Sequence, residues 1–195
     1  MSGWLRRRRD AAPSTIDVDQ IYPYLVPEDY PDALSTGAQS QRRIGHGLSV
    51  ALVTPTGPAD AQILGAVGAA GLAGAGIDLA TAYGHADRAL SAALSAGQIA
   101  LEFFDRGPSG APTVVASGSW LAATTLVAPG LYERMTRFLG EDIVAAVPHR
   151  ELLFLFGADA TGAMAEIVAT EHRGARKPLT TGFFTLDPAG PTPRS

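Results

Sequence analysis

The most informative stretch of the sequence is Ile143-Val144-Ala145-Ala146-Val147-Pro148-His149-Arg150-Glu151-Leu152-Leu153-Phe154-Leu155-Phe156. Two apolar runs flank a short segment at which the chain can turn, and Pro148 fixes one backbone angle there. Short apolar runs with β-branched and aromatic residues, bounded by turn residues, predict strands. We therefore expect a pair of strands joined by a short turn.

Helices and strands are predicted on both sides of this hairpin. Apolar residues recur every three or four positions over 79–94, which indicates a helix that Gly97 ends. Residues 120–127 fit a short helix or an extended stretch equally well. The other expected strands are 48–53, 98–104, 112–117 and 183–186, and the other expected helices are 63–72, 131–139 and one capped by Asp159 and ended by Gly174.

The order of these elements predicts the fold class. Paired strands alternate with single helices, which favours an α+β fold with a mostly antiparallel sheet and helices packed on one face. We expect residues 1–40 to be a partly irregular N-terminal arm, because they contain an arginine run and the Tyr-Pro pairs Tyr22-Pro23 and Tyr30-Pro31. Residues 41–187 are expected to form a single α+β core domain, and 188–195 a flexible tail.

Composition excludes several classes of protein. With 46% hydrophobic and 17% charged residues, the 195-residue chain has enough apolar material for a core. It has no cysteine, so disulfides, thiolate nucleophiles and cysteine zinc sites are excluded. A net charge of -4 argues against a general nucleic-acid binder.

The sequence also bears on location. Arg6 to Arg9 are followed by Asp10 and Pro13 rather than by the apolar stretch of a secretory signal. No apolar run reaches the ~18 residues of a membrane span. We therefore expect a cytoplasmic protein, and we favour a solvated tail over weak membrane-surface contact by Arg6 to Arg9.

Cofactor motifs are not recognisable. Gly71, Gly74 and Gly76 lack the spacing of a dinucleotide-binding loop, and no phosphate-binding lysine motif follows them. The 4 histidines show no metal-ligand spacing. We therefore expect neither a cofactor nor a metal.

Ser117 and Ser119 are the candidate nucleophiles. Ser117-Gly118-Ser119 follows a predicted strand, as in a nucleophile elbow, but the flanking glycines of G-x-S-x-G are missing. A hydrolase or transferase would pair one of these serines with His149 or His85. Serine and glycine are also ordinary turn residues, and this interpretation is favoured.

Arg150, His149 and Asp105 are the candidate binding residues. The guanidinium of Arg150 is a permanently charged donor that could bind a carboxylate or a phosphate. It could equally pair with a nearby acidic residue and hold the hairpin in register, which is the favoured role. Asp105 lies in a predicted turn after 98–104.

The hairpin resembles a motif of the bacterial YtpQ-like proteins, a domain family of unknown function. The similar segment is Gly140 to Leu153, and the resemblance extends over about 45–187 through the strand at 48–53, the helix near Leu90, and Pro129 with Leu131. The chain differs from the family pattern at three polar positions, namely Glu151, Arg88 or Ala89, and Thr124. The resemblance implies the fold and a bacterial origin, but no activity.

Three hypotheses of function follow. The first is a non-enzymatic binding or protein-interaction domain that contacts a partner protein, or its own copies, through strand edges and the N-terminal arm. The second is a small hydrolase or transferase with a Ser/His pair. The third is anion or nucleotide binding at Arg150.

Overall fold

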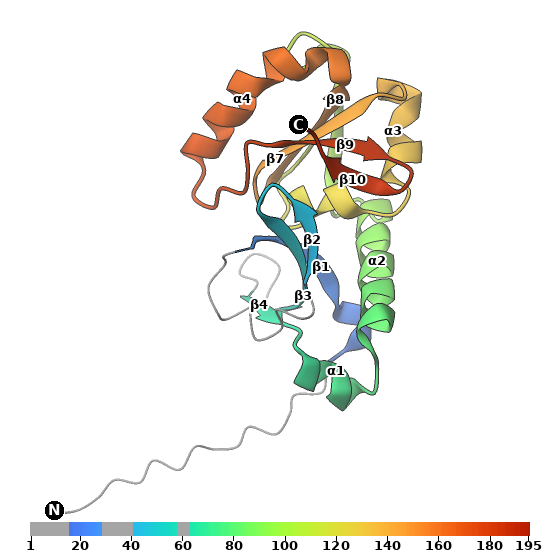
Figure 1. The fold of residues 1–195 in the computed structure, drawn as a ribbon. Helices are drawn as coiled ribbons and strands as arrows, with labels where there is room; N and C mark the ends of the chain where they lie inside the picture. Colours follow the sequence, from blue (N-terminus) through green and yellow to red (C-terminus); the bar gives the residue numbers. More distant parts are fainter. Residues whose placement is uncertain (1–15, 29–40, 58–62) are drawn as a thin grey trace, which may run out of the picture.

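A computed structural model describes residues 16–28, 41–57 and 63–195, and Figure 1 shows how their helices and strands are arranged. Within these ranges the strands form two sheets, and every paired strand is antiparallel to its neighbour. The expected α+β class is therefore confirmed. None of the described helices combines the length and apolar character that a bilayer crossing requires.

The larger sheet has the predicted hairpin at its centre. Its strand order is β10-β9-β7-β8-β6-β5. The strands are β5 (Ala100–Phe104), β6 (Thr113–Ser117), β7 (Ile143–His149), β8 (Leu152–Gly157), β9 (Phe183–Asp187) and β10 (Gly190–Pro193). β7 pairs with β8 from Ile143↔Gly157 to Ala146↔Phe154, and the register shifts before His149↔Leu152. The prediction of two strands joined by a short turn is confirmed.

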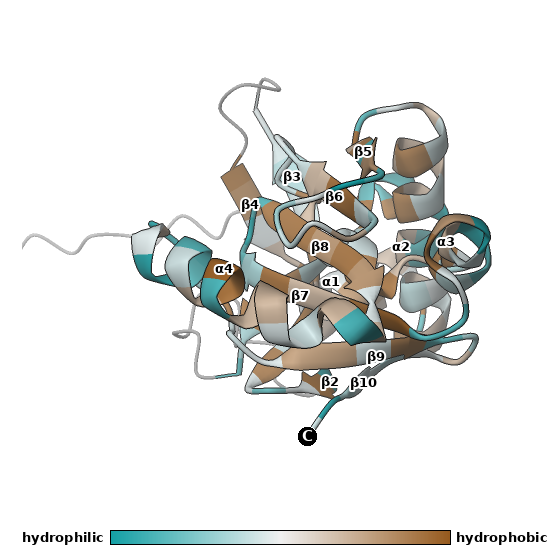
Figure 2. Ribbon diagram, turned by 90° about the horizontal axis from the view of Figure 1, so that it is seen from above, coloured by the Kyte–Doolittle hydropathy of each residue, from teal (hydrophilic) through white to brown (hydrophobic). Residues whose placement is uncertain are grey.

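Helices cover both faces of this sheet, not the single face that we expected. Ile143 and Ala145 of β7 pack on the side of η3 (Ala123–Val127) and α3 (Leu131–Leu139). Val144 and Ala146 pack on the side of α4 (Thr161–Gly174). The reason is that both central strands are apolar along their length, as Figure 2 shows for β8, so neither face can be left in water.

The smaller sheet is built around β3 (Leu48–Thr56). β1 (Tyr22–Pro27) pairs along one side of it, and β2 (Arg42–Gly45) and β4 (Ile63–Ala66) pair along the other side. β1 lies inside the expected, partly irregular arm, and residues 22–27 are its regular part. β1 tolerates its two prolines because its described ladder is with β3 alone, and a strand at an edge needs fewer N–H donors.

Two other expectations need correction. Residues 190–193 form β10 on β9 and are not a flexible tail, because Gly190 adopts a φ of 113° that closes a tight hairpin. The expected helix over 63–72 is a strand, β4, followed by α1 (Ala69–Ala75). The rest of the expected arm, 1–15 and 29–40, lies outside the described residues.

The predicted helix over 79–94 is confirmed as α2 (Leu79–Ser95), which packs against β1 and β3. The side chain of Asp78 accepts a hydrogen bond of 2.7 Å from the Thr81 N–H. Hydrogen bonding with the Thr81 side chain, and then with its backbone, lowers the pKa of that carboxyl. Gly97 follows the helix with a φ of 71°, and the Gln98 N–H donates to the Ala93 carbonyl, as in a Schellman motif.

The beginning of α4 differs from the prediction that Asp159 caps it. Its N-cap residue is Ala160, which offers no side-chain acceptor. Asp159 lies one residue earlier, in the short 3-10 helix η4 (Ala158–Ala160). The Thr161 hydroxyl instead donates to the Ala158 carbonyl at 2.7 Å.

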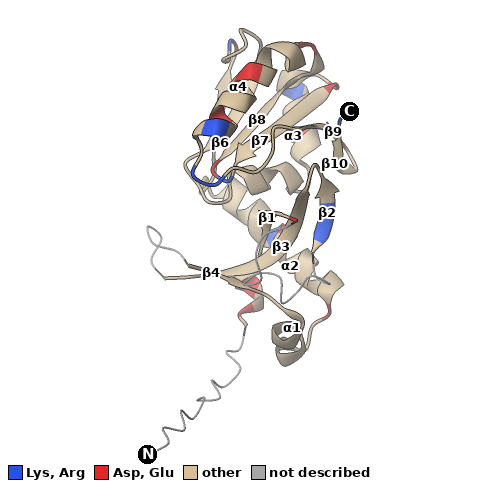
Figure 3. Ribbon diagram, turned by 60° about the vertical axis from the view of Figure 1, so that its left-hand side comes forward, with Lys and Arg blue, Asp and Glu red and all other residues tan. Residues whose placement is uncertain are grey.

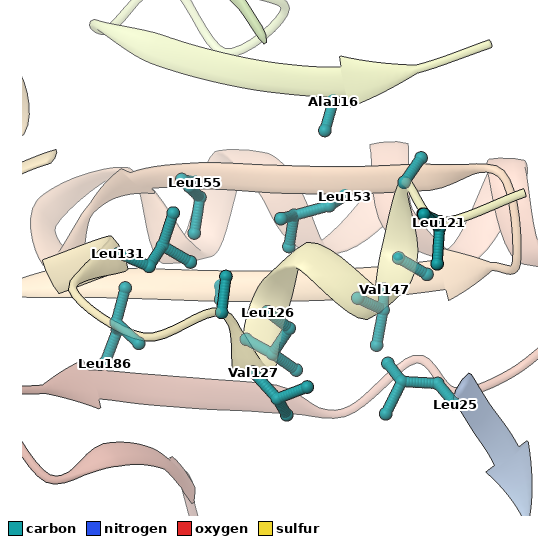
Figure 4. Packing of buried hydrophobic residues seen from close by; sticks show 14 of the residues in the cluster. Leu25, Ala116, Leu121, Leu126, Val127, Leu131, Val147, Leu153, Leu155 and Leu186 are labelled. Carbon is teal, nitrogen blue, oxygen red and sulfur yellow. The ribbon is translucent and has the colours of Figure 1, made fainter. Parts of the chain in front are cut away.

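The two sheets share one hydrophobic core. Leu25, Leu48 and Val50 of the smaller sheet belong to the same buried cluster as Val147 and Leu153 of the larger sheet. Figure 4 shows the segment around η3 between them, with Leu121, Leu126 and Val127 among residues of both sheets. For this segment, 120–127, the sequence fitted a short helix and an extended stretch equally well, and the structure shows a 3-10 helix.

The β2–β3 turn fastens the smaller sheet to β9. His46 adopts a φ of 51°, its Nε2 donates to the Phe183 carbonyl at 2.7 Å, and its ring meets the Phe184 ring edge-on at 5.0 Å. A Cβ at position 182 would lie 2.5 Å from Cγ of His46. The contact therefore requires glycine at position 182.

We expect Gly182→Ala to destabilise the protein by about 1–3 kcal/mol, because the added methyl group displaces the His46 ring. Gly162→Ala in α4 is the matched control, since a Cβ at position 162 meets nothing within 4 Å and alanine favours a helix. Urea unfolding should show a lower midpoint for the first variant and an unchanged or higher midpoint for the second. Equal midpoints for the two variants would contradict the role of this contact.

Candidate functional site

Arg150 lies in the turn between β7 and β8, with its side chain only 7% exposed. Its Nη1 donates to the Tyr24 hydroxyl at 3.4 Å, and its guanidinium carbon lies 5.3 Å from the centre of the Tyr24 ring. Its carbonyl accepts from the Ala123 N–H at 3.3 Å. These contacts tie the hairpin to β1 and to the segment before η3, so they favour a structural role for Arg150.

The rings around Arg150 form a small aromatic cluster at the junction of the sheets. Trp120 meets Tyr22 nearly perpendicularly at 5.4 Å and Tyr24 at 5.8 Å between ring centres. Two tyrosines of the N-terminal region thus pack against a tryptophan that follows β6. Tyr24 itself is 4% exposed.

His149 points away from Arg150, towards α4. Its Nε2 lies 3.9 Å from a carboxylate oxygen of Glu171, and its Nδ1 accepts from the Glu151 N–H at 3.3 Å. Both ring nitrogens therefore face groups of the protein itself. His149 and Arg150 are neighbours in sequence, but His149 contacts α4 whereas Arg150 contacts β1.

The candidate serines do not meet a histidine. Ser117 pairs across the sheet with Leu152, and Leu152 pairs with His149, so a whole strand separates Ser117 from that ring. The Ser119 hydroxyl oxygen accepts from the Leu121 N–H at 3.3 Å, which is a local turn contact. His85 lies instead 3.4 Å from a carboxylate oxygen of Asp19.

Among the described residues, no hydrogen bond joins a serine hydroxyl to a histidine ring. Asp105 is an exposed residue of the β5–β6 turn, next to Phe104, whereas Ser117 is at the opposite end of that hairpin. The candidate residues are therefore dispersed over the fold and do not converge on one pocket; they are Ser117, Ser119, His149, Arg150 and Asp105. The geometry required of a nucleophile and its base is not assembled.

A hollow of about 300 Å³ lies where the two sheets meet. It is lined by residues of β2, α2, the beginning of α3 and the β9–β10 turn, among them Arg42, Asp87, Tyr132 and Asp187. Figure 3 shows the basic segment of β2 in blue on this side of the molecule. No local sequence pattern indicates this hollow, because its walls come from segments far apart in the chain.

Asp87 is the most unusual group in the wall of the hollow. Burial raises the pKa of its carboxyl, and the charge of Arg42 opposes this shift. One carboxylate oxygen, Oδ1, is buried and has no hydrogen-bond partner within the described ranges. The guanidinium of Arg42 lies over the Tyr83 ring, 5.3 Å from its centre.

A second surface feature is the outer edge of β5. Among the described strands of the larger sheet β5 is terminal, and it pairs with β6 alone. Phe103 is 51% exposed and Phe104 39% exposed, and with Ile63 they are the exposed large hydrophobic residues of the described chain. The Phe103 ring packs edge-on against Phe138 of α3 at 5.3 Å.

The alternation of a strand explains why both phenylalanines remain exposed. Neighbouring side chains of a strand point to opposite faces, so Phe103 lies on the face of α3 and Phe104 on the other face. One face of a terminal strand cannot bury both rings. The pair Phe103-Phe104 was the available sequence signal, but the terminal position of the strand was not visible.

Comparison of the chain with protein-family models, with curated proteins and with solved structures finds no match. The resemblance to the YtpQ-like family therefore stays a prediction.

We expect Arg150→Ala to lower the free energy of unfolding by about 1–3 kcal/mol, because a buried charged donor and its contact with Tyr24 are lost. Arg173→Ala is the matched control, since Arg173 is exposed on α4 and donates only to Thr170. The control should change stability by less than about 0.5 kcal/mol. Urea unfolding measures both, and an equal effect in the two variants would contradict the structural role of Arg150.

We expect Asp87→Asn to change how stability depends on pH. Because the pKa of Asp87 is raised in the folded protein, its contribution is complete below the ordinary value of about 3.9 and is lost as the pH rises through the raised value. The variant should therefore gain stability relative to the wild type as the pH rises from about 3 to about 6. Unfolding midpoints across this range test it, and a difference that is constant with pH would contradict it.

Proposed function

We propose that this chain is a non-enzymatic binding domain that contacts a partner protein through the free edge of β5. The observation that carries the proposal is the presence of two adjacent, exposed phenylalanines on a terminal strand. A terminal strand presents unpaired N–H and C=O groups to which another chain can add a strand. Exposed aromatic rings beside that edge supply apolar contact area.

The two edge strands of the larger sheet, β10 and β5, differ in how readily another strand can pair with them. β10 carries Pro191 and Pro193, which lack an N–H and so limit the pairing of another strand. β5 has no proline, its register with β6 contains no bulge, and its sequence is Ala-Leu-Glu-Phe-Phe. Because β5 lacks proline, bulge and lysine, the features that oppose pairing there are the charge of Glu102 and the short length of the strand.

The dispersed polar candidates support the same proposal. The contacts of Ser119, His149 and Arg150 are with groups of the protein itself, and that of Ser119 is local. An interaction domain needs an accessible surface and no convergent catalytic set. The β5 edge provides such a surface, whereas the serines and histidines do not provide a catalytic set.

We also propose a bacterial, cytoplasmic setting and kinship with the YtpQ-like proteins. The support for kinship is the segment from Gly140 to Leu153, whose hairpin has the strand pairing that the resemblance implies. The support for a reducing compartment is the absence of cysteine.

The proposal is tested by replacing both phenylalanines, as Phe103→Lys with Phe104→Lys, in the full chain. The wild type and the double variant are each used in a pull-down from a bacterial lysate, and the retained proteins are quantified by mass spectrometry. We expect the double variant to lose the proteins that the wild type retains, because lysines oppose strand pairing at an edge and the apolar contact of the two rings is removed. Ile63→Lys is the matched control, since Ile63 is 72% exposed on another strand, β4.

The control variant should retain the same proteins as the wild type, and circular dichroism should show that all three chains are folded. Retention of the same proteins by all three chains would contradict the proposal. So would a strictly monomeric wild type, by light scattering, that retains nothing above background.

A further inference from the structure

Glu102 is the central residue of β5, the terminal strand that also carries Phe103 and Phe104. Its side chain is exposed and belongs to no ion pair within the described ranges. On its inner side it faces Val115 of β6, which offers no charge. A charged partner can approach this side chain from the edge of β5 that pairs with no other described strand.

Strand alternation determines which neighbours an added strand would meet. A residue paired directly with Glu102 would place its side chain on the face of Glu102 and Phe104. The residues before and after it would lie on the other face, beside Leu101 and Phe103. There the Phe138 ring extends the apolar surface, and Leu101 packs against the same core.

From this arrangement we infer that the β5 edge takes an extended segment of another protein in which a basic residue, opposite Glu102, stands between two apolar residues. The inference rests on the proposed function and names the partner's chemistry. Opposite charges on directly paired residues stabilise a sheet, and like charges there destabilise it. The apolar neighbours add contact with Leu101 and Phe103.

A second copy of this chain fits the edge less well. In a two-fold antiparallel pairing centred on β5, Glu102 would lie directly opposite Glu102 of the copy, which is the unfavourable case. A shifted register would separate the carboxylates, but it would leave part of each short strand unpaired. The charge of Glu102 thus selects against self-association and for a basic segment.

The test uses two synthetic peptides that differ at one position, Thr-Val-Lys-Val-Thr and Thr-Val-Glu-Val-Thr, each extended by the same polar residues. They are titrated into the full-length wild type and into Glu102→Lys, and chemical shifts of the backbone amides report affinity and location. We expect the wild type to prefer the lysine peptide by about two- to fivefold, with the affected amides in β5. Glu102→Lys should reverse the preference, and added salt should reduce both preferences.

Glu102→Gln provides a second variant that removes the charge with little change of shape, and it should bind the two peptides equally. Equal binding of both peptides by the wild type, with shifts in β5, would overturn the inference and leave the proposed function standing. Absence of shifts in β5 with either peptide would count against both. Concentration-dependent shifts in β5 without peptide, together with a dimer by light scattering, would assign the edge to a second copy and overturn the inference.

Discussion

The burial of β7 and β8 on both faces is the constraint on which the rest of the structure depends. Two adjacent strands that are apolar along their length cannot leave either side in water. One side is closed by η3 and α3, and the other by α4. The strands β9 and β6 then pair with the outer sides of this hairpin and place β10 and β5 at the two edges of the sheet.

The smaller sheet depends on the same centre through a few specific contacts. Arg150, in the turn of the central hairpin, reaches Tyr24 of β1, while His46 of the β2–β3 turn reaches the carbonyl of Phe183 in β9. Both contacts lie where the two sheets meet, and the shared hydrophobic core lies between them. A buried arginine and a closely packed histidine in these positions hold the sheets in one orientation.

The edges of the larger sheet differ in a way that bears on function. Prolines limit pairing at β10, whereas β5 presents Phe103 and Phe104 beside an edge that pairs with no other described strand. An exposed edge of this kind carries a risk of unspecific association, and exposed apolar surface often marks an interaction site. The side chains of β5 therefore bear on the chemistry of the proposed partner. In the proposed interaction, the charge of Glu102 at the centre of the strand would favour a basic segment over an acidic one.

Local sequence patterns determined the elements whose signal lies within a few residues. The hairpin at 143–157, the helix from Leu79 and its end at Gly97 were predictable because periodicity and turn residues act over short distances. The tertiary structure alone decided which strands lie at an edge, that β1 and β10 are paired, and that Ser117 and His149 are separated by a strand. These facts depend on pairing between segments far apart in the chain, which no local pattern specifies, and the accessible edge of β5 is one of them.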